Sequence, residues 1–389
     1  MASVSVGLFA VGLVIVVLTA ASVLFTIVLP REPRGFQRLS AVVNRVVQVA
    51  FIALSRLVKT YEKKDSLLAP TAPVTLLAQL LFWALCFVVG YGLMLQHTTH
   101  QLGSALIQAT GAVFTVGTID LSGPANSAVD IAAGATWVVI VALQIAYLPA
   151  LYAAFNRRES LVAMLESRGG LPAWGPEVLA RHQLVGIIDT LPDFYASWET
   201  WSAELVESHT TYPVMLLFRS PEAWFSWLIG LLAVMDGAAM HLALAPSTAS
   251  SQARLCLRMG FTAVNRIASV QGLKVDPDPN PEGPITLTFD EFNQAVEMLR
   301  DVGFPMERSA EEAWPEFRGW RVNYEASVYW LANRLTAPPA PWSGNRRHLR
   351  SGPVAPRRPP QRQPGILAER RPSVVVSPQS RRGGSSRTP

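Results

Sequence analysis

The sequence predicts an all-α membrane protein in which a membrane-embedded half is followed by a helical aqueous half. Half of the 389 residues are hydrophobic, and only 16% are charged. This composition is too apolar for an ordinary soluble protein and too polar for a chain that lies in the bilayer throughout. Three uncharged runs that are long enough to cross the hydrocarbon core lie before about residue 155, where the two halves are expected to meet.

Hydropathy and charge divide the chain into five expected segments. The membrane half consists of a spanning helix, a basic cytoplasmic linker, and a module with two further spanning helices. The aqueous half consists of a helical cytoplasmic domain and a disordered tail rich in Pro and Arg. In chain order, these segments cover residues 1–30, 31–73, 74–155, 156–336 and 337–389.

The first uncharged run, residues 4–29, predicts a spanning helix, because about 20 apolar residues cross the hydrocarbon core. A cleaved signal peptide is the alternative. No Lys or Arg precedes the run, and the run is longer than the apolar region of a signal peptide. We therefore expect a retained helix.

The linker that follows is strongly basic. Its apolar stretch, residues 39–58, is interrupted by Arg45 and Arg56. Charges within an apolar stretch are typical of a helix that lies at the membrane surface and not of a buried span. The linker is thus expected to hold an interfacial helix.

Two more uncharged runs, residues 74–96 and 131–155, predict the second and third spans. The loop between them, residues 97–130, contains no Lys or Arg, whereas Arg157 and Arg158 directly follow the third span. The positive-inside rule then places the N-terminus and this loop outside, and the basic linker and everything after Arg157 inside. A multi-pass protein of the cell membrane is expected.

The outer loop contains an apolar stretch, residues 102–114, that is long enough for a helix but too short to cross the bilayer. A short helix that is followed by an extended strip and a return of the chain to the same side is a re-entrant loop. Non-helical backbone is tolerated at membrane depth only where it lines protein or water, and its carbonyl oxygens can replace the hydration shell of a cation. The residues of the expected ion-conducting strip are Thr115, Val116, Gly117, Thr118, Ile119 and Asp120.

Residues 74–155 resemble the two-helix pore module of potassium channels, with an outer helix, a pore helix, a filter and an inner helix. The motif residues are Thr115, Val116, Gly117 and Asp120. The resemblance implies that the backbone of Thr115, Val116 and Gly117 holds K⁺ as the permeant ion. Because the chain contains one such module and the filter needs four, it also implies a homotetramer.

Two residues depart from the family pattern. An aromatic residue and a second Gly usually follow the first Gly, but this chain has Thr118 and Ile119. The second Gly lets the backbone adopt a positive φ, which a β-branched Ile strongly disfavours. We therefore expect weaker potassium selectivity than is usual in the family.

The resemblance also implies an inner helix that gates by bending. Gly134 and Pro149 are the candidate hinges. Proline leaves a carbonyl without its helical donor and can kink a spanning helix. For Gly134, close packing of two helices through a small residue is the alternative.

The aqueous half reads as helices separated by Pro and Gly. Residues 223–245 are apolar enough to span, but Asp236 and His241 would be costly near mid-membrane, which favours a buried core helix. Residues 207–245 resemble the helical cytoplasmic domain of some bacterial potassium-channel-like proteins. Thr288 and Glu291 predict a capping box at the start of a later helix.

The tail is the basic part of the chain. From residue 336 on, it holds eleven Arg but a single acid, Glu369. Such a tail could contact anionic lipid, and a solvated disordered tail is the alternative. No specific nucleic-acid binding is expected.

The sequence lacks a phosphate-binding Gly loop, a zinc-protease motif and a nucleotide-fold signature, and its two Cys cannot form a disulfide framework. No enzyme activity and no cofactor are therefore expected. The leading hypothesis is a homotetrameric cation channel subunit. The alternative is a non-conducting membrane scaffold with a degenerate pore loop.

Overall fold

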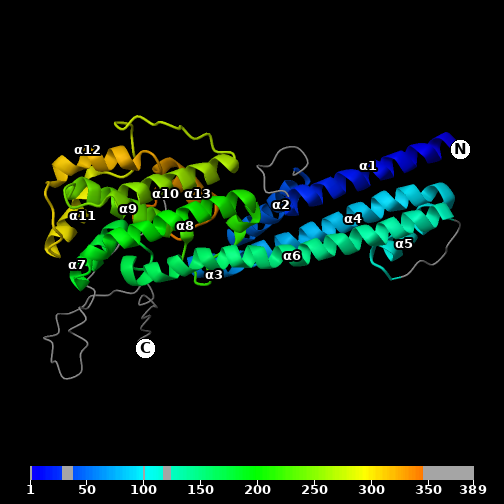
Figure 1. Cartoon of the computed structure of the whole chain (residues 1–389), viewed down its shortest axis with the longest axis horizontal. Coiled ribbons are helices and arrows are strands. Elements are labelled where there is room, and N and C mark those ends of the chain that lie inside the picture. The colour runs from blue at the N-terminus through cyan, green and yellow to red at the C-terminus, as the bar shows by residue number, and fades with distance from the viewer. Residues whose placement is uncertain (1, 29–37, 100, 117–123, 345–389) are drawn as a thin grey trace, which may run out of the picture. The chain divides into compact units, whose positions relative to one another are not determined.

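The computed structural model describes residues 2–28, 38–99, 101–116 and 124–344 (Figure 1). Within these ranges, every regular element is an α-helix or a short 3₁₀ helix, which confirms the predicted all-α class. Four helical stretches are long and apolar enough to cross a membrane, which supports a multi-pass membrane protein. These stretches are Val6–Ile27, Tyr61–Gln96, Asn126–Gly169 and Trp227–Leu244.

The chain forms two compact units. The first combines Met1–Arg157 with Ser208–Arg219, and the second combines Arg158–Glu207 with Ser220–Pro389. The segment Ser208–Arg219, which falls within the expected cytoplasmic domain of residues 156–336, groups with the first unit.

The first unit contains the elements that the sequence predicted for the membrane half. Residues 74–96 and 131–155 lie within two longer helices, and residues 102–113 form the short helix between them. The second of the long helices, α6, continues into the second unit. In chain order, the elements are α1 (Ala2–Ile27), α2 (Arg38–Ser55), α3 (Tyr61–Leu68), α4 (Thr71–Thr99), α5 (Leu102–Val113), α6 (Pro124–Gly169) and the 3₁₀ helix η3 (Pro213–Leu217).

Glycines allow α1 and α4 to approach closely. A Cβ atom at Gly12 would lie 2.4 Å from the carbonyl oxygen of Gly90, and a Cβ atom at Gly90 would lie 2.8 Å from Val16 Cγ2. A side chain at Gly12 would collide with the backbone of α4, and one at Gly90 would displace the Val16 side chain. Small residues at such crossings are the usual basis of helix packing in membranes, where apolar burial alone gives little driving force.

The second unit is built around α9 (Trp227–Leu244), all of whose residues are buried. The structure thus agrees with the expectation of a buried core helix within residues 223–245. The length and composition of α9 alone would also allow it to span a membrane. The other elements of this unit are α7 (Gly175–Val185), η2 (Ile188–Thr190), α8 (Leu191–Thr211, whose last residues belong to the first unit), α10 (Ser251–Val270), α11 (Phe289–Asp301), α12 (Ala310–Arg321) and α13 (Glu325–Arg334).

The fully buried Arg321 is the centre of a polar network in this unit. Its Nη1 donates to Asp236 Oδ1 at 2.5 Å, and its Nε donates to Glu325 Oε2 at 2.6 Å. Its Nη2 donates to Tyr329 Oη at 2.8 Å and to the carbonyl oxygen of Trp342 at 2.7 Å. The charge on Asp236, the predicted obstacle to a span, is therefore paired inside the protein.

The capping box of Thr288 and Glu291 is confirmed at the start of α11, and a second one joins Ser309 and Glu312 at the start of α12. Residues 337–344, at the start of the expected tail, are part of the second unit, and Trp342 is buried there. The basic tail from residue 345 on lies outside the described residues.

Candidate functional site

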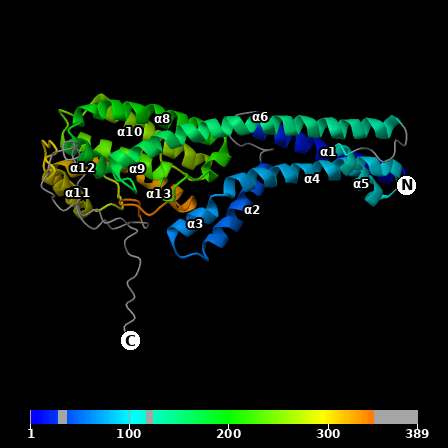
Figure 2. The same ribbon diagram turned by 90° about the horizontal axis from the view of Figure 1, so that it is seen from below.

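The candidate site is the short helix α5 and the residues that follow it. The 12 residues of α5 span about 18 Å, less than the roughly 30 Å of a hydrocarbon core. Within the first unit, α5 lies beside the end of α4 that is far from α2 and α3 (Figure 2). The predicted half-helix therefore exists where the sequence placed it, between the two long helices α4 and α6.

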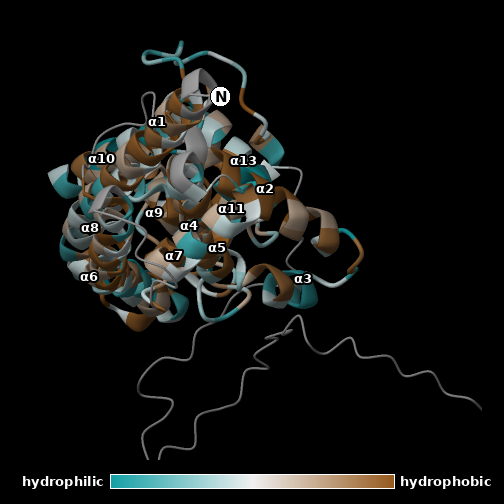
Figure 3. Cartoon of the chain, turned by 90° about the vertical axis from the view of Figure 1, so that its right-hand side faces the viewer, coloured by the Kyte–Doolittle hydropathy of each residue, from teal (hydrophilic) through white to brown (hydrophobic). Residues whose placement is uncertain are grey.

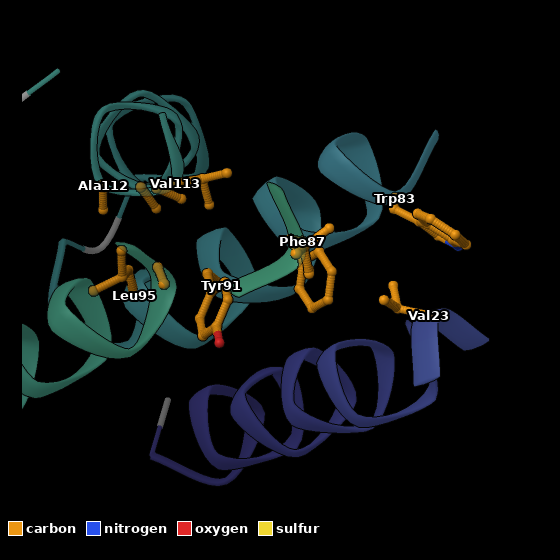
Figure 4. Close-up of a cluster of buried hydrophobic side chains, with 11 residues drawn as sticks. Val23, Trp83, Phe87, Tyr91, Leu95, Ala112 and Val113 are labelled. Carbon is orange, nitrogen blue, oxygen red and sulfur yellow. The ribbon is translucent and has the colours of Figure 1, made fainter. Parts of the chain in front are cut away.

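Small side chains seat α5 against its neighbours. Its buried face carries Ala105, Ala109 and Ala112, and Figure 4 shows Ala112 and Val113 close to Leu95 of α4. A cluster of buried side chains joins α5 to α1, α4 and α6. Its members are Val23, Trp83, Phe87, Tyr91, Leu95, Ala105, Ala109, Ala112, Val113, Ala133 and Ile140.

Two polar contacts fix the long helix α6 to the rest of this core. Gln108 Nε2 of α5 donates to Asp130 Oδ2 of α6 at 2.8 Å, and both side chains are buried. The hydroxyl groups of Tyr91 in α4 and Thr136 in α6 lie 2.8 Å apart. Neither pair was predicted from the sequence. A Gln or Asp at the edge of an apolar stretch does indicate a hydrogen-bonded partner, because buried polar side chains are nearly always hydrogen-bonded.

The chain leaves α5 in a tight turn. The Val116 N–H donates to the Gly111 carbonyl at 3.0 Å, and the Thr115 N–H donates to the Ala112 carbonyl at 3.2 Å. This pair of bonds is a Schellman motif, which requires a left-handed residue, and Thr115 supplies it with φ of 57°. The expectation of an extended strip from Thr115 on is therefore wrong at its first residue, because the turn at Thr115 pairs the N–H groups of Thr115 and Val116 with the last carbonyls of the helix.

A positive φ at Thr115 is unusual, since β-branched residues rarely adopt it. Next to it, the side chain of Val116 is 84% exposed within the single chain. The remaining predicted strip residues, Gly117, Thr118, Ile119 and Asp120, lie outside the described residues. Of the predicted potassium ligands, the structure thus describes the backbone of the first two.

The two candidate hinges have different surroundings. A Cβ atom at Gly134 would lie 3.3 Å from the carbonyl oxygen of Ala112, so this glycine allows α5 and α6 to approach closely, as the packing alternative expected. Pro149 lies inside α6, where it removes one helical hydrogen bond. Of the two, Pro149 is the better candidate for a hinge.

A segment from much later in the chain packs beside Pro149. This return segment, residues 212–219, buries Val214, Met215 and Phe218 against α6 and the start of α4. The rings of Tyr147 and Tyr212 lie 5.6 Å apart, as do those of Phe155 and Phe218. The helix around the candidate hinge is therefore held by aromatic packing that sequence reasoning did not predict.

Ionic and hydrogen bonds anchor the end of the return segment. Arg219 forms an ion pair with Asp65 of α3, and its Nη2 donates to Tyr61 Oη at 2.8 Å. The segment thus contacts three elements of the first unit: α3, α4 and α6. No family model, no curated protein and no solved structure matches the chain.

Proposed function

We propose that this chain is a subunit of a homotetrameric cation channel with a potassium-like filter. One observation carries the proposal. A half-helix of 12 residues packs on two long apolar helices, and the residues Thr115, Val116 and Gly117 follow it in the sequence. Such a helix cannot cross the membrane, so the chain after it must return, and its backbone needs a pore or protein around it.

The electrostatics of α5 favour a cation. The C-terminal end of a helix carries a partial negative charge, and here that end leads directly into the expected strip. Carbonyl oxygens of the strip would supply the ligands for a dehydrated ion. The Gln108–Asp130 bond and the alanine face of α5 hold this end in place, as a preorganised site requires.

One module supplies one quarter of a fourfold filter, so four chains are needed. Exposed apolar side chains near the strip agree with this requirement, since Val116 is 84% exposed in the single chain and Phe114, which contacts Trp137 with one side of its ring, is also exposed. The substitutions at Thr118 and Ile119 favour relaxed selectivity, with sodium passing as well as potassium.

The return segment suggests how the pore is controlled. It packs on α6 around Pro149, and both of its ends continue into the second unit. A rearrangement of the second unit would pull on this segment and so bias bending of the inner helix.

The oligomeric state tests the stoichiometry that this function requires. Native mass spectrometry of the full chain, released from detergent micelles or nanodiscs, is expected to show four copies of the 42.4 kDa chain. A monomer or a dimer would contradict the proposal, because neither can close a fourfold ring from one module per chain. A non-conducting scaffold, unlike a channel, would pass no cation in proteoliposomes.

A further inference from the structure

The helix α2 has its polar and apolar sides reversed relative to a helix on a water-facing surface. Val42, Val46 and Val49 are 59%, 62% and 58% exposed. At about 100° per residue they share one side of the helix. The opposite side carries Ser40 and Ser55, which are both buried.

Hydroxyl groups on the buried side of α2 form hydrogen bonds, including bonds to α1. Ser40 Oγ lies 2.9 Å from Thr26 Oγ1 and 3.3 Å from Ser22 Oγ, both in α1. Ser55 Oγ donates to the Ile52 carbonyl of its own helix at 2.7 Å. Hydrogen bonds between hydroxyl groups of neighbouring helices are typical of packing inside membranes, where water does not compete for them.

The outward side combines an apolar stripe with positive charge. Arg45 lies in α2, Arg56 directly follows its last residue, and both are exposed. The Arg56 N–H donates to the Ile52 carbonyl at 3.3 Å, which continues the helical turn, so that both Arg residues lie along the same edge of the valine stripe. Among the described residues, neither forms an ion pair. Figure 3 shows the contrast with α3, which is largely hydrophilic, whereas α2 is largely hydrophobic.

This pattern fits a phospholipid better than a second copy of the chain. Exposure of an apolar stripe to water is unfavourable, whereas contact with lipid acyl chains would remove it from water. The long Arg side chains can extend from the edge of the stripe to the level of the headgroups, where a guanidinium binds phosphate through two hydrogen bonds. A symmetric contact between two α2 helices would instead bring like charges together.

We propose that α2 lies in the leaflet that the positive-inside pattern assigns to the cytoplasm, with Val42, Val46 and Val49 against acyl chains. Arg45 and Arg56 bind the phosphate groups of anionic phospholipids there. The proposal is independent of ion conduction, because it rests on α1 and α2 alone.

Spin labels test the position of α2. In a chain with Cys86→Ser and Cys256→Ala, a label at Val46→Cys is expected to be accessible to oxygen and shielded from a water-soluble nickel complex in lipid nanodiscs. A label at Asp278→Cys, in an exposed loop, is the aqueous control and should show the reverse. Nickel accessibility at position 46 equal to that at position 278 would overturn the proposal, as would a label shielded from both reagents, which indicates a protein partner.

Thermal unfolding of the chain with its native cysteines tests the phosphate contacts. Phosphatidylglycerol is expected to raise the unfolding temperature relative to phosphatidylcholine, and inorganic phosphate is not. The rise should be lost in Arg45→Gln/Arg56→Gln and kept in Arg254→Gln/Arg258→Gln, a matched pair of exposed Arg in α10. An undiminished rise in the first double variant, or an equal rise with inorganic phosphate, would overturn the headgroup assignment.

Discussion

Arg321→Ala is expected to destabilise the second unit by about 3–5 kcal/mol, because it leaves Asp236 and Glu325 buried without their cation. The loss extends beyond the two ion pairs. Arg321 also holds the carbonyl of Trp342, which ties the end of the described chain to the core. Removing the guanidinium therefore frees that end and opens a cavity beneath it.

Hydrogen exchange measures this effect locally, which suits a protein with two units. Amides of α9 and α12 should lose protection by about 100-fold or more, since every 1.4 kcal/mol corresponds to a factor of ten. The control is Arg300→Ala, which breaks an exposed ion pair with Glu297 and should change protection little. Equal effects of the two variants would contradict the central role of Arg321.

Within the same network, Glu325 makes a contribution to stability whose pH dependence has a defined direction. Burial raises the pKa of Glu325, but the charge of Arg321 and hydrogen bonds from Thr286 and Arg321 outweigh it and hold the pKa below the ordinary value of 4.5. A group whose pKa is lowered by folding stabilises the fold at neutral pH, and this contribution is lost as the pH falls below that ordinary value. In Arg321→Ala, this acid-dependent contribution should shrink.

Phe218→Ala is expected to weaken the hold of the return segment on the inner helix by about 3 kcal/mol. Phe218 is buried, and its ring lies 5.6 Å from that of Phe155 and 5.9 Å from that of Tyr152. Its loss leaves a cavity next to the helix that contains Pro149. In the proposed channel, release of this contact should raise cation flux, because the hinge can then bend more freely.

Hydrogen exchange again supplies a readout that does not depend on conduction. Amides of the return segment should lose protection by about 100-fold. Phe114→Ala, which removes an exposed ring at the other end of the first unit, should leave these amides unchanged. Unchanged protection in Phe218→Ala would show that this ring does not anchor the segment.

The sequence was sufficient for features that depend on local composition. Uncharged runs located α1, α4 and α6, and a short apolar stretch located α5. Asp236 correctly argued for a core helix at α9, since a carboxylate is costly in hydrocarbon. The capping box at Thr288 also followed from residue types at fixed spacing.

Features that depend on contacts between distant residues could not be predicted. Arg321 and Asp236 are 85 positions apart. The return segment has an ordinary apolar composition, so nothing in it indicates that it packs beside Pro149. Pro and Ser around residue 340 suggested disorder, but Trp342 packs against Arg321 and orders that stretch. Thr115 carries no sign of a left-handed conformation, because glycine normally fills that position.

Cation flux through the segment after α5 is the central claim, and proteoliposomes test it most directly. The full chain should pass potassium, and sodium as well, while Gly117→Ala should abolish flux by placing a methyl group in the strip. Gly103→Ala is the matched control, because a Cβ atom there meets no atom within 4 Å, and its flux should equal that of the unmodified chain. An unmodified chain that passes no cation, or flux that persists in Gly117→Ala, would contradict the proposal.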